Sequence, residues 1–342
     1  MISPIPNRYL SIVSFLNFRW LKKNWAIALI FGLTLSLLFT ACNGGGKAKV
    51  VRIGYQRVTD LEILKTRGTL EERLKPEGIT VEWSLFNAGP PLMEALGANQ
   101  LDLGGVGEVP PIFAQAAGAD LLYVATKPPV PQTYGILVPK NSSIKTLADL
   151  KGKKVAFVRG SSAHFLLVAA LKSAGLQITD IVPAYLPASD ARPALTQGRV
   201  DAWAIWDPFL SSTQASGDAT LLVDGTGLGN NTSFIISSRS FAESNPELLK
   251  IVLEELQKSD DWAKANIDEL TKEFAPLLNL PPDIAKKILA RRSYGVLPID
   301  QAVLEKQQEI ANIFFDLKLI PKQIDVNLWA WKAAILILKS NK

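Results

Sequence analysis

Strand-like and helix-like segments alternate along most of this chain. Residues 49–56 indicate a strand that opens into a loop, and residues 80–86 alternate apolar and polar side chains before the turn at 87–91 starts a helix. Strands that alternate with helices are typical of βαβ units, which build mostly parallel sheets. The pattern therefore predicts an α/β fold.

The same pattern repeats in a second unit, and the chain then becomes helical. In the first unit we expect further strands at 101–106, 121–125 and 134–138 and a helix at 112–117. In the second unit we expect strands at 154–158, 181–185, 200–206, 221–223 and 233–237, with helices at 144–150, 164–174, 188–198 and from 207 onward. The last part predicts helices at 246–266, 267–279, 282–293, 299–317 and 325–338.

The length of the chain predicts two lobes. Beyond the N-terminal apolar run about 300 residues remain, more than a single hydrophobic core usually serves. We expect lobe 1 to comprise residues 50–137 and 239–342, and lobe 2 to comprise residues 138–238 as an insertion. Ligands of such sheets bind outside the carboxyl ends of the strands, which here means the cleft between the lobes.

The N-terminus has the features of a secretory signal. Arg8, Arg19, Lys22 and Lys23 precede an apolar run that ends at Cys42, and no acidic residue accompanies them. A cysteine directly after Thr-Ala resembles the lipid-attachment motif of bacterial lipoproteins, although Phe replaces the usual Leu. We expect residues 1–41 to be a lipoprotein-type signal peptide and the Gly-rich residues 42–49 to be a tether. An uncleaved anchor helix is the alternative, and both place the protein outside the cytoplasm.

Composition excludes several kinds of chemistry. Cys42 is the only cysteine and His164 the only histidine, so disulfides, thiolate nucleophiles and multi-histidine metal sites are excluded, and we expect no cofactor. Removal of the four basic signal residues lowers the formal net charge from +5 to +1. No cluster of Lys and Arg suggests binding to nucleic acid. No other segment is long and apolar enough to span a membrane.

Three Gly-containing turns before helices could face the expected cleft, at 89–91, 107–110 and 160–162. Glycine allows the backbone to approach a ligand, and the free N–H groups of a helix N-terminus attract anions. Ser161 and Ser162 add hydroxyl donors. Ordinary turn and capping chemistry is the alternative for each turn taken singly. Together the turns favour a binding site for an anion.

Several segments, in a fixed order, carry a resemblance to one family. They are residues 51–56, 87–96, 107–120, 146–152, 160–164 and 201–208. These segments resemble the aliphatic sulfonate-binding proteins of ABC importers, and the similarity continues to about Trp331. The resemblance implies a two-lobed periplasmic binding protein fold of type II that closes on its ligand by a hinge. It also implies a monomeric periplasmic receptor that delivers sulfonates to an ABC permease and its ATPase for sulfur uptake. The lipid anchor expected at Cys42 departs from the family, many of whose members have an ordinary cleaved signal and are soluble.

The resemblance also implies which residues line the cleft. They are Gln56, Gly89, Gly107, Glu108, Ser161, Ser162, His164, Trp206 and Asp207. Gln56 and the two serines would donate hydrogen bonds to the sulfonate oxygens, and Trp206 would pack along its alkyl chain.

Structural roles remain open for several of these residues. Asp207 before a proline suits a helix N-cap. Glu108 suits a first helical turn, or could hold the amine of an aminosulfonate such as taurine. His164 could simply occupy a first turn, and Trp206 could belong to the core.

Other functions remain possible on the same fold. One alternative is a receptor for nitrate, bicarbonate, taurine or a thiamine precursor, and another is a sensor that signals in its closed form. An enzyme would need Ser161 or Ser162 beside His164, but no third residue is marked to orient the imidazole. The desulfinases of this fold use a cysteine, which the chain lacks beyond Cys42. We therefore expect a receptor rather than an enzyme.

Overall fold

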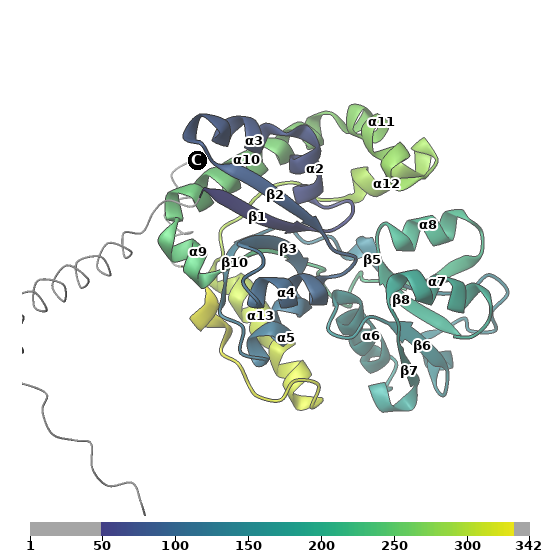
Figure 1. Ribbon diagram of the computed structural model, residues 1–342. Coiled ribbons are helices and arrows are strands. Elements are labelled where there is room, and N and C mark those ends of the chain that lie inside the picture. Colours follow the sequence, from purple (N-terminus) through teal and green to yellow (C-terminus); the bar gives the residue numbers. More distant parts are fainter. Residues whose placement is uncertain (1–48, 332–342) are drawn as a thin grey trace, which may run out of the picture. The chain divides into compact units, whose positions relative to one another are not determined.

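The computed structural model describes residues 49–331 and contains two five-stranded sheets, one in each lobe (Figure 1). The predicted signal peptide, the tether up to residue 48 and Cys42 lie outside the described residues. The first sheet has the order β2-β1-β3-β10-β4, with β1 (Val50–Tyr55), β2 (Thr80–Leu85), β3 (Leu103–Gly107), β4 (Leu121–Thr126) and β10 (Ser233–Ser238). The second has the order β7-β6-β8-β5-β9, with β5 (Tyr134–Pro139), β6 (Lys154–Phe157), β7 (Val182–Tyr185), β8 (Ala202–Trp206) and β9 (Ala219–Asp224).

One strand in each sheet runs against the other four, and the path of the chain explains why. β10 pairs antiparallel with β3 and β4, and β5 pairs antiparallel with β8 and β9. β4 ends at Thr126, and residues 127–133 then lead into the second sheet. β5 therefore starts at the cleft, where its neighbours end. Residues 225–232 return to the first sheet in the same way and place the start of β10 at the cleft.

The sheets correct the expected lobe boundaries. The boundary at 137/138 would divide β5, which belongs wholly to the second sheet. The boundary at 238/239 would assign β10 to lobe 2, although it lies between β3 and β4 of the first sheet. The chain thus passes between the lobes at residues 127–133 and 225–232, and both segments lie at the cleft.

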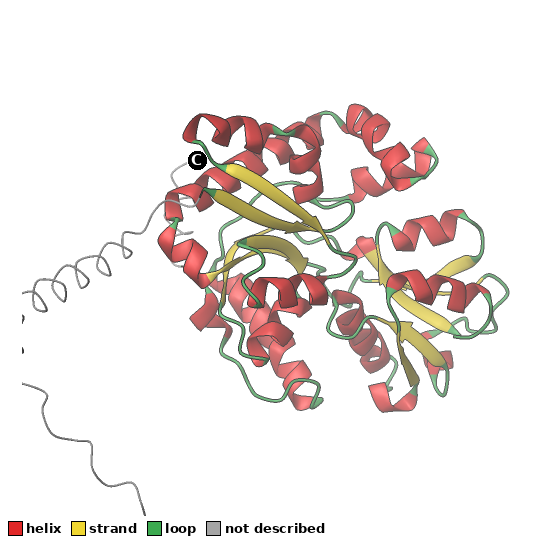
Figure 2. Cartoon of the chain, viewed as in Figure 1, coloured by secondary structure: helices red, strands yellow, loops and turns green. Residues whose placement is uncertain are grey.

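Helices cover both sheets, as Figure 2 shows. The first lobe carries α2 (Asp60–Arg67), α3 (Thr69–Leu74), α4 (Gly89–Gly97), α5 (Val109–Ala116), α9 (Arg239–Ser244), α10 (Pro246–Ala265), α11 (Ile267–Leu278), α12 (Pro282–Arg291) and α13 (Gln301–Asp316). The second lobe carries α6 (Ser162–Ser173), α7 (Ala188–Thr196) and α8 (Phe209–Ala215). The prediction that the C-terminal helices return to lobe 1 holds for α10, which packs against α2 and α3.

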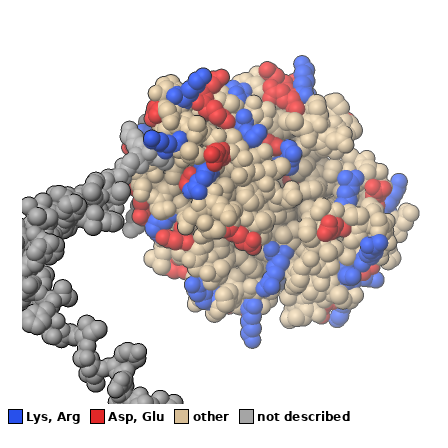
Figure 3. Space-filling view, viewed as in Figure 1, with Lys and Arg blue, Asp and Glu red and all other residues tan. Residues whose placement is uncertain are grey.

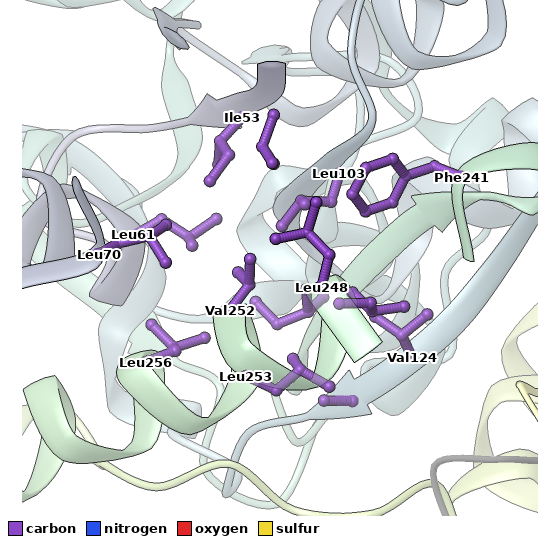
Figure 4. Close-up of a cluster of buried hydrophobic side chains, with 14 of the residues drawn as sticks. Ile53, Leu61, Leu70, Leu103, Val124, Phe241, Leu248, Val252, Leu253 and Leu256 are labelled. Atoms are coloured by element: carbon purple, nitrogen blue, oxygen red, sulfur yellow. The ribbon is translucent and has the colours of Figure 1, made fainter. Parts of the chain in front are cut away.

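The amphipathic helix α10 shows how the first lobe is held together (Figure 4). Its buried residues Leu249, Val252, Leu253 and Leu256 recur at helical spacing and join the cluster that contains Ile53. Burying each such side chain contributes about 1.5–3 kcal/mol. This stripe fixes α10 against the first sheet and thereby places the next helices, α11 and α12, near the cleft.

Four parts of the prediction differ from the structure. The helix expected at 144–150 is the short 3-10 turn η4 (Leu147–Leu150). The helices α2 and α3 were not predicted, nor was α9. Asp60 to Leu64 are five consecutive buried residues of α2, so the segment shows no amphipathic period. The helix expected at 325–338 is a short 3-10 turn, η6 (Val326–Trp329), within the described part, and residues 332–338 lie outside it.

The surface in Figure 3 carries Lys and Arg interspersed with Asp and Glu. No basic stripe stands out on this face. Between residues 49 and 331, no helix combines the length and the apolar character needed to cross a bilayer. The same residues contain no group of three or more His, Cys, Asp or Glu side chains that could hold a metal ion.

Candidate functional site

A cavity lies between the lobes, at the carboxyl ends of strands from both sheets. Seven of the nine predicted site residues line it, namely Gln56, Gly89, Gly107, Ser161, Ser162, Trp206 and Asp207. They come from all three predicted turns and from the ends of β1 and β8. Glu108 and His164 do not line the cavity.

Gln56 follows β1 directly and presents an amide to the cavity. Its Nε2 donates a hydrogen bond to the carbonyl of Gly105 at 3.1 Å, which fixes the orientation of the amide. Because a primary amide has two N–H donors, one remains for a ligand. The predicted donor role of Gln56 is compatible with this geometry.

The start of α6 combines capping with exposure to the cavity. Ser161 is the N-cap, since its Oγ accepts from the His164 N–H at 3.3 Å and donates to the Val158 carbonyl at 2.7 Å. Gly160 precedes it with a φ of 73°, a left-handed conformation that favours glycine. The Ser161 hydroxyl proton is thus engaged within the turn, whereas Ser162 opens the helix and lines the cavity.

Gly107 of lobe 1 lies directly against Ser162 of lobe 2. A Cβ atom at position 107 would overlap the Ser162 Oγ. Only glycine allows the end of β3 to approach the N-terminus of α6 this closely. The contact shows that the two lobes meet around the cavity.

Asp207 contacts the start of α8 and also joins the lobes. The N-cap residue of α8 is Pro208, not Asp207 as expected, but Asp207, one residue earlier, accepts through its Oδ1 from the Ser211 N–H in the first turn at 3.1 Å. Its other oxygen forms an ion pair with Arg291 of α12, and Arg291 also donates to the Ser211 Oγ at 2.5 Å. Asp207 is only 3% exposed in its side chain, against 29% for Arg291. This link between lobes was not predicted.

Four buried charges form a second network at the cavity. Lys127 Nζ lies 3.1 Å from Asp60 and also pairs with Asp260, while Arg292 lies 3.0 Å from Asp60. Burial would raise the pKa of Asp60, but Lys127 and Arg292 outweigh it and hold this pKa below its ordinary value. For Asp260, burial and the nearby Asp60 charge raise the pKa. Asp60, Lys127 and Arg292 line the cavity.

These ion pairs determine what the cavity can bind. The two carboxylates that line it, Asp60 and Asp207, are both paired with cations. The remaining polar lining consists of Arg57, which pairs with Glu62 at 2.9 Å, and of amides and hydroxyls, among them Gln56 and Ser162. Neutral donors beside compensated charges suit a monoanion better than a cation. Trp206 adds an apolar wall beside them and contacts Phe209 edge-on at 6.4 Å.

His164 is a packing residue rather than a cavity residue. Its ring stacks on Phe157 at 4.7 Å and meets Phe314 edge-on at 5.1 Å, and its Nδ1 accepts from the Gly160 N–H at 3.3 Å. Burial, and secondly the charge of Arg159, lowers the pKa of His164 to about 4. The prediction that His164 lines the cleft is therefore corrected.

We expect His164→Leu to remove an acid sensitivity of folding. The unfolded chain takes up a proton near pH 6.5 but the folded one only near pH 4, so stability is lost as the pH falls below 6.5. Between pH 7 and pH 5 this loss should amount to about 2 kcal/mol in the unaltered protein and vanish in the variant. Urea unfolding at both pH values tests this, and equal losses in the two proteins would contradict it.

The prediction missed the polar residues of the two crossing segments. Thr133 and Asn231 line the cavity and hydrogen bond to each other, Nδ2 to Oγ1, at 2.7 Å. Lys127 also belongs to a crossing segment. A signal was present, because residues 127–131 contain three prolines and residues 225–232 contain three glycines. Such stretches are typical of connections between lobes.

Three comparisons relate this chain to known proteins. A family model described as NMT1/THI5 like matches residues 74–269. An aliphatic sulfonates-binding protein of Escherichia coli (strain K12) is 42% identical over 307 residues, which cover 90% of this chain and 95% of the relative. The alkanesulfonate-binding protein SsuA of Xanthomonas axonopodis pv. citri, solved with MOPS bound, is 42% identical with a TM-score of 0.81, over 84% of this chain and 99% of that one. The crystal structure of the periplasmic aliphatic sulphonate binding protein SsuA of Escherichia coli gives a TM-score of 0.76 at 42% identity, over 84% and 93% of the chains.

Proposed function

Because the chain belongs to the NMT1/THI5-like family and, within it, to the aliphatic sulfonate-binding proteins, we propose that it captures aliphatic sulfonates outside the cytoplasm and delivers them to an ABC importer for sulfur uptake. The observation that carries this proposal is the interlobe cavity, where donor side chains meet an apolar wall and every lining carboxylate is paired. The protein is a receptor and not an enzyme, in line with the relatives reported above, which are named as binding proteins.

The binding step uses charge-free donors. A sulfonate keeps its negative charge at any biological pH, so its oxygens only accept hydrogen bonds. The second N–H of Gln56, the Ser162 hydroxyl and the first N–H groups of α6 supply donors from both lobes. Each hydrogen bond to a charged group contributes about 1.5–3 kcal/mol, so a few suffice for micromolar affinity, about 8 kcal/mol. Trp206 covers the alkyl chain.

The proposal includes finer features. Residues 1–41 would be removed as a lipoprotein-type signal, Cys42 would carry the lipid, and the receptor would act as a monomer at the periplasmic face of a membrane. Its partners would be the ABC permease and the ATPase of the importer. Mass spectrometry of the protein purified from membranes would reveal the acyl groups on Cys42.

Titration calorimetry tests the ligand class. The protein from residue 43 onward contains the whole compact unit 47–342 and can be titrated with ethanesulfonate, longer alkanesulfonates, taurine, sulfate and nitrate. We expect micromolar affinity for alkanesulfonates and no heat with sulfate or nitrate, because a donor-lined cavity with an apolar wall matches only the first group.

The alternatives give different results. Heat with nitrate, bicarbonate or a thiamine precursor, and none with any sulfonate, would mean that the fold serves another ligand. Binding of taurine above alkanesulfonates would indicate that a lining carboxylate is released to hold the amine. Failure of a deletion strain to grow on sulfonates, with normal growth on sulfate, would separate transport from sensing.

A further inference from the structure

Glu108 is buried where the two lobes meet. It precedes α5 of lobe 1 and is only 2% exposed. The Ser162 hydroxyl of lobe 2 and the backbone N–H of Thr232 in the second crossing segment lie near its carboxyl, although neither carboxyl oxygen has a hydrogen-bond partner among the described residues. Ser162 also lines the ligand cavity, so it stands between Glu108 and the ligand.

No cation compensates this carboxyl within residues 49–331. The ionisable groups around it are Tyr134 of β5, Lys127 directly after β4, His164 of α6, Asp300 before α13, and Lys306 and Glu309 of α13. None of the cations forms a salt bridge with Glu108, since Lys127 pairs with Asp60 and Asp260 and Lys306 pairs with Glu309. From α13, Gln307 donates to the backbone carbonyl of Glu108 at 2.6 Å rather than to its side chain. Neither carboxyl oxygen completes a full hydrogen bond. Burial raises the pKa of Glu108 to about 8, and Ser162 and Thr232 offset only part of the rise.

The charge on Glu108 decides what Ser162 can offer a ligand. A serine hydroxyl has a single proton to donate. Beside a carboxylate, that proton is drawn to Glu108, and only lone pairs of Ser162 face the cavity. Beside a protonated carboxyl, Ser162 accepts from Glu108 and its own proton is free to point at an anion.

We propose that Glu108 is a positioning residue that binds a proton from solvent when the lobes close and so directs the Ser162 hydroxyl toward the bound sulfonate. The inference rests on the proposed function, since it needs a ligand that only accepts hydrogen bonds. The receptor then captures one proton together with each anion, so that closure buries the sulfonate charge beside a neutral carboxyl instead of beside a second negative charge. Gly107 links proton uptake to lobe closure. It has no side chain to keep β3 away from α6, so Glu108 and Ser162 meet when β3 and α6 come into contact.

Proton uptake determines the direction in which the Kd for the sulfonate changes with pH. Under this proposal, separation of the lobes must expose Glu108, so that it titrates near its ordinary value of 4.5 in the open form and near 8 in the closed form. Between these two pH values the closed form binds more protons than the open form, so the Kd for the sulfonate should rise with pH by up to about tenfold per pH unit. Below about pH 4.5 and above about pH 8 the dependence should disappear.

Calorimetry with ethanesulfonate at pH 6.5 measures the protons directly. The titration is run in cacodylate, whose ionisation absorbs almost no heat, and in imidazole, whose ionisation absorbs much. Sulfonate buffers such as MOPS are avoided, since a relative binds MOPS. We expect uptake of close to one proton per ligand in the unaltered protein and in Glu94→Gln, an exposed carboxylate of α4. In Glu108→Gln the uptake should vanish and Kd should become independent of pH.

The outcomes separate this inference from the proposed function. Equal heats in the two buffers for the unaltered protein would overturn the inference while leaving sulfonate binding intact, and this result does not depend on any variant folding. Persistence of the uptake in Glu108→Gln would assign the proton to another group and would also overturn it. Absence of ethanesulfonate binding at every pH from 5 to 8 would instead contradict the proposed function itself.

Discussion

Lys127→Met is expected to lower the free energy of unfolding by about 3–5 kcal/mol at pH 8, because it leaves a buried carboxylate without its cation. Lys127 is 3% exposed and Asp260 is fully buried. Arg292 remains beside Asp60, but Asp260 keeps only the Gly295 N–H, which donates to it at 2.8 Å. The cost arises mainly from Asp260.

The loss should depend on pH. Burial and the charge of Asp60 already raise the pKa of Asp260, and Lys127 opposes that rise. In the variant the pKa of folded Asp260 lies further above its unfolded value, so the stability of the variant falls as the pH rises. At pH 5 a protonated Asp260 is neutral, and the difference from the unaltered protein should shrink.

Urea unfolding at pH 5 and pH 8 measures both effects. Lys306→Met is a matched control, since Lys306 pairs with Glu309 on the exposed surface and its loss should change stability by no more than about 1 kcal/mol. The double variant Lys127→Met/Asp260→Asn has no carboxylate at position 260 that could be left without a cation, so most of the lost stability should return. A loss in Lys127→Met as small as in the control would show that the network contributes little.

Local signals in the sequence were sufficient to predict the α/β class and the three turns that contribute residues to the cavity. Glycine and proline at 89–91 and 107–110 mark the starts of helices, since α4 begins at Gly89 and α5 at Val109. The helix α2 escaped prediction because its buried residues are consecutive, although Thr59 as N-cap and Gly68 in the left-handed conformation mark its two ends. Capping residues were the better signal here than periodicity.

Sheet membership and ion pairs depend on contacts that are distant in sequence. β5 is mainly apolar, as is β4 before it in the sequence, so composition does not separate the two strands. Only the pairing of β5 with β8 and β9 assigns it to lobe 2. The pair Lys127–Asp260 joins residues 133 positions apart, and Arg291–Asp207 joins residues 84 apart. The sequence around a charged residue does not indicate which distant residue will pair with it. The residues that neutralise the cavity could therefore be found only in the folded chain.

Arg291→Met is expected to weaken sulfonate binding by about 30- to 150-fold, or about 2–3 kcal/mol. Arg291 does two things for the closed form, since it ties α12 to α8 and neutralises the Asp207 carboxylate that lines the cavity. Without it, an unpaired carboxylate with 3% side-chain exposure faces the incoming anion. The partial exposure of Arg291 places the effect at the lower end of the range for buried pairs.

The double variant separates the tie between lobes from the charge. Asp207→Asn keeps an oxygen to accept from the Ser211 N–H but carries no charge, so Arg291→Met/Asp207→Asn lacks both the ion pair and the repulsion. If repulsion dominates, the double variant should bind alkanesulfonates at least tenfold more tightly than Arg291→Met. If the tie dominates, the two should bind equally weakly. Calorimetric Kd values for the four proteins of this cycle give the coupling energy between Arg291 and Asp207, and a value near zero would mean that Arg291 does not act on binding through Asp207.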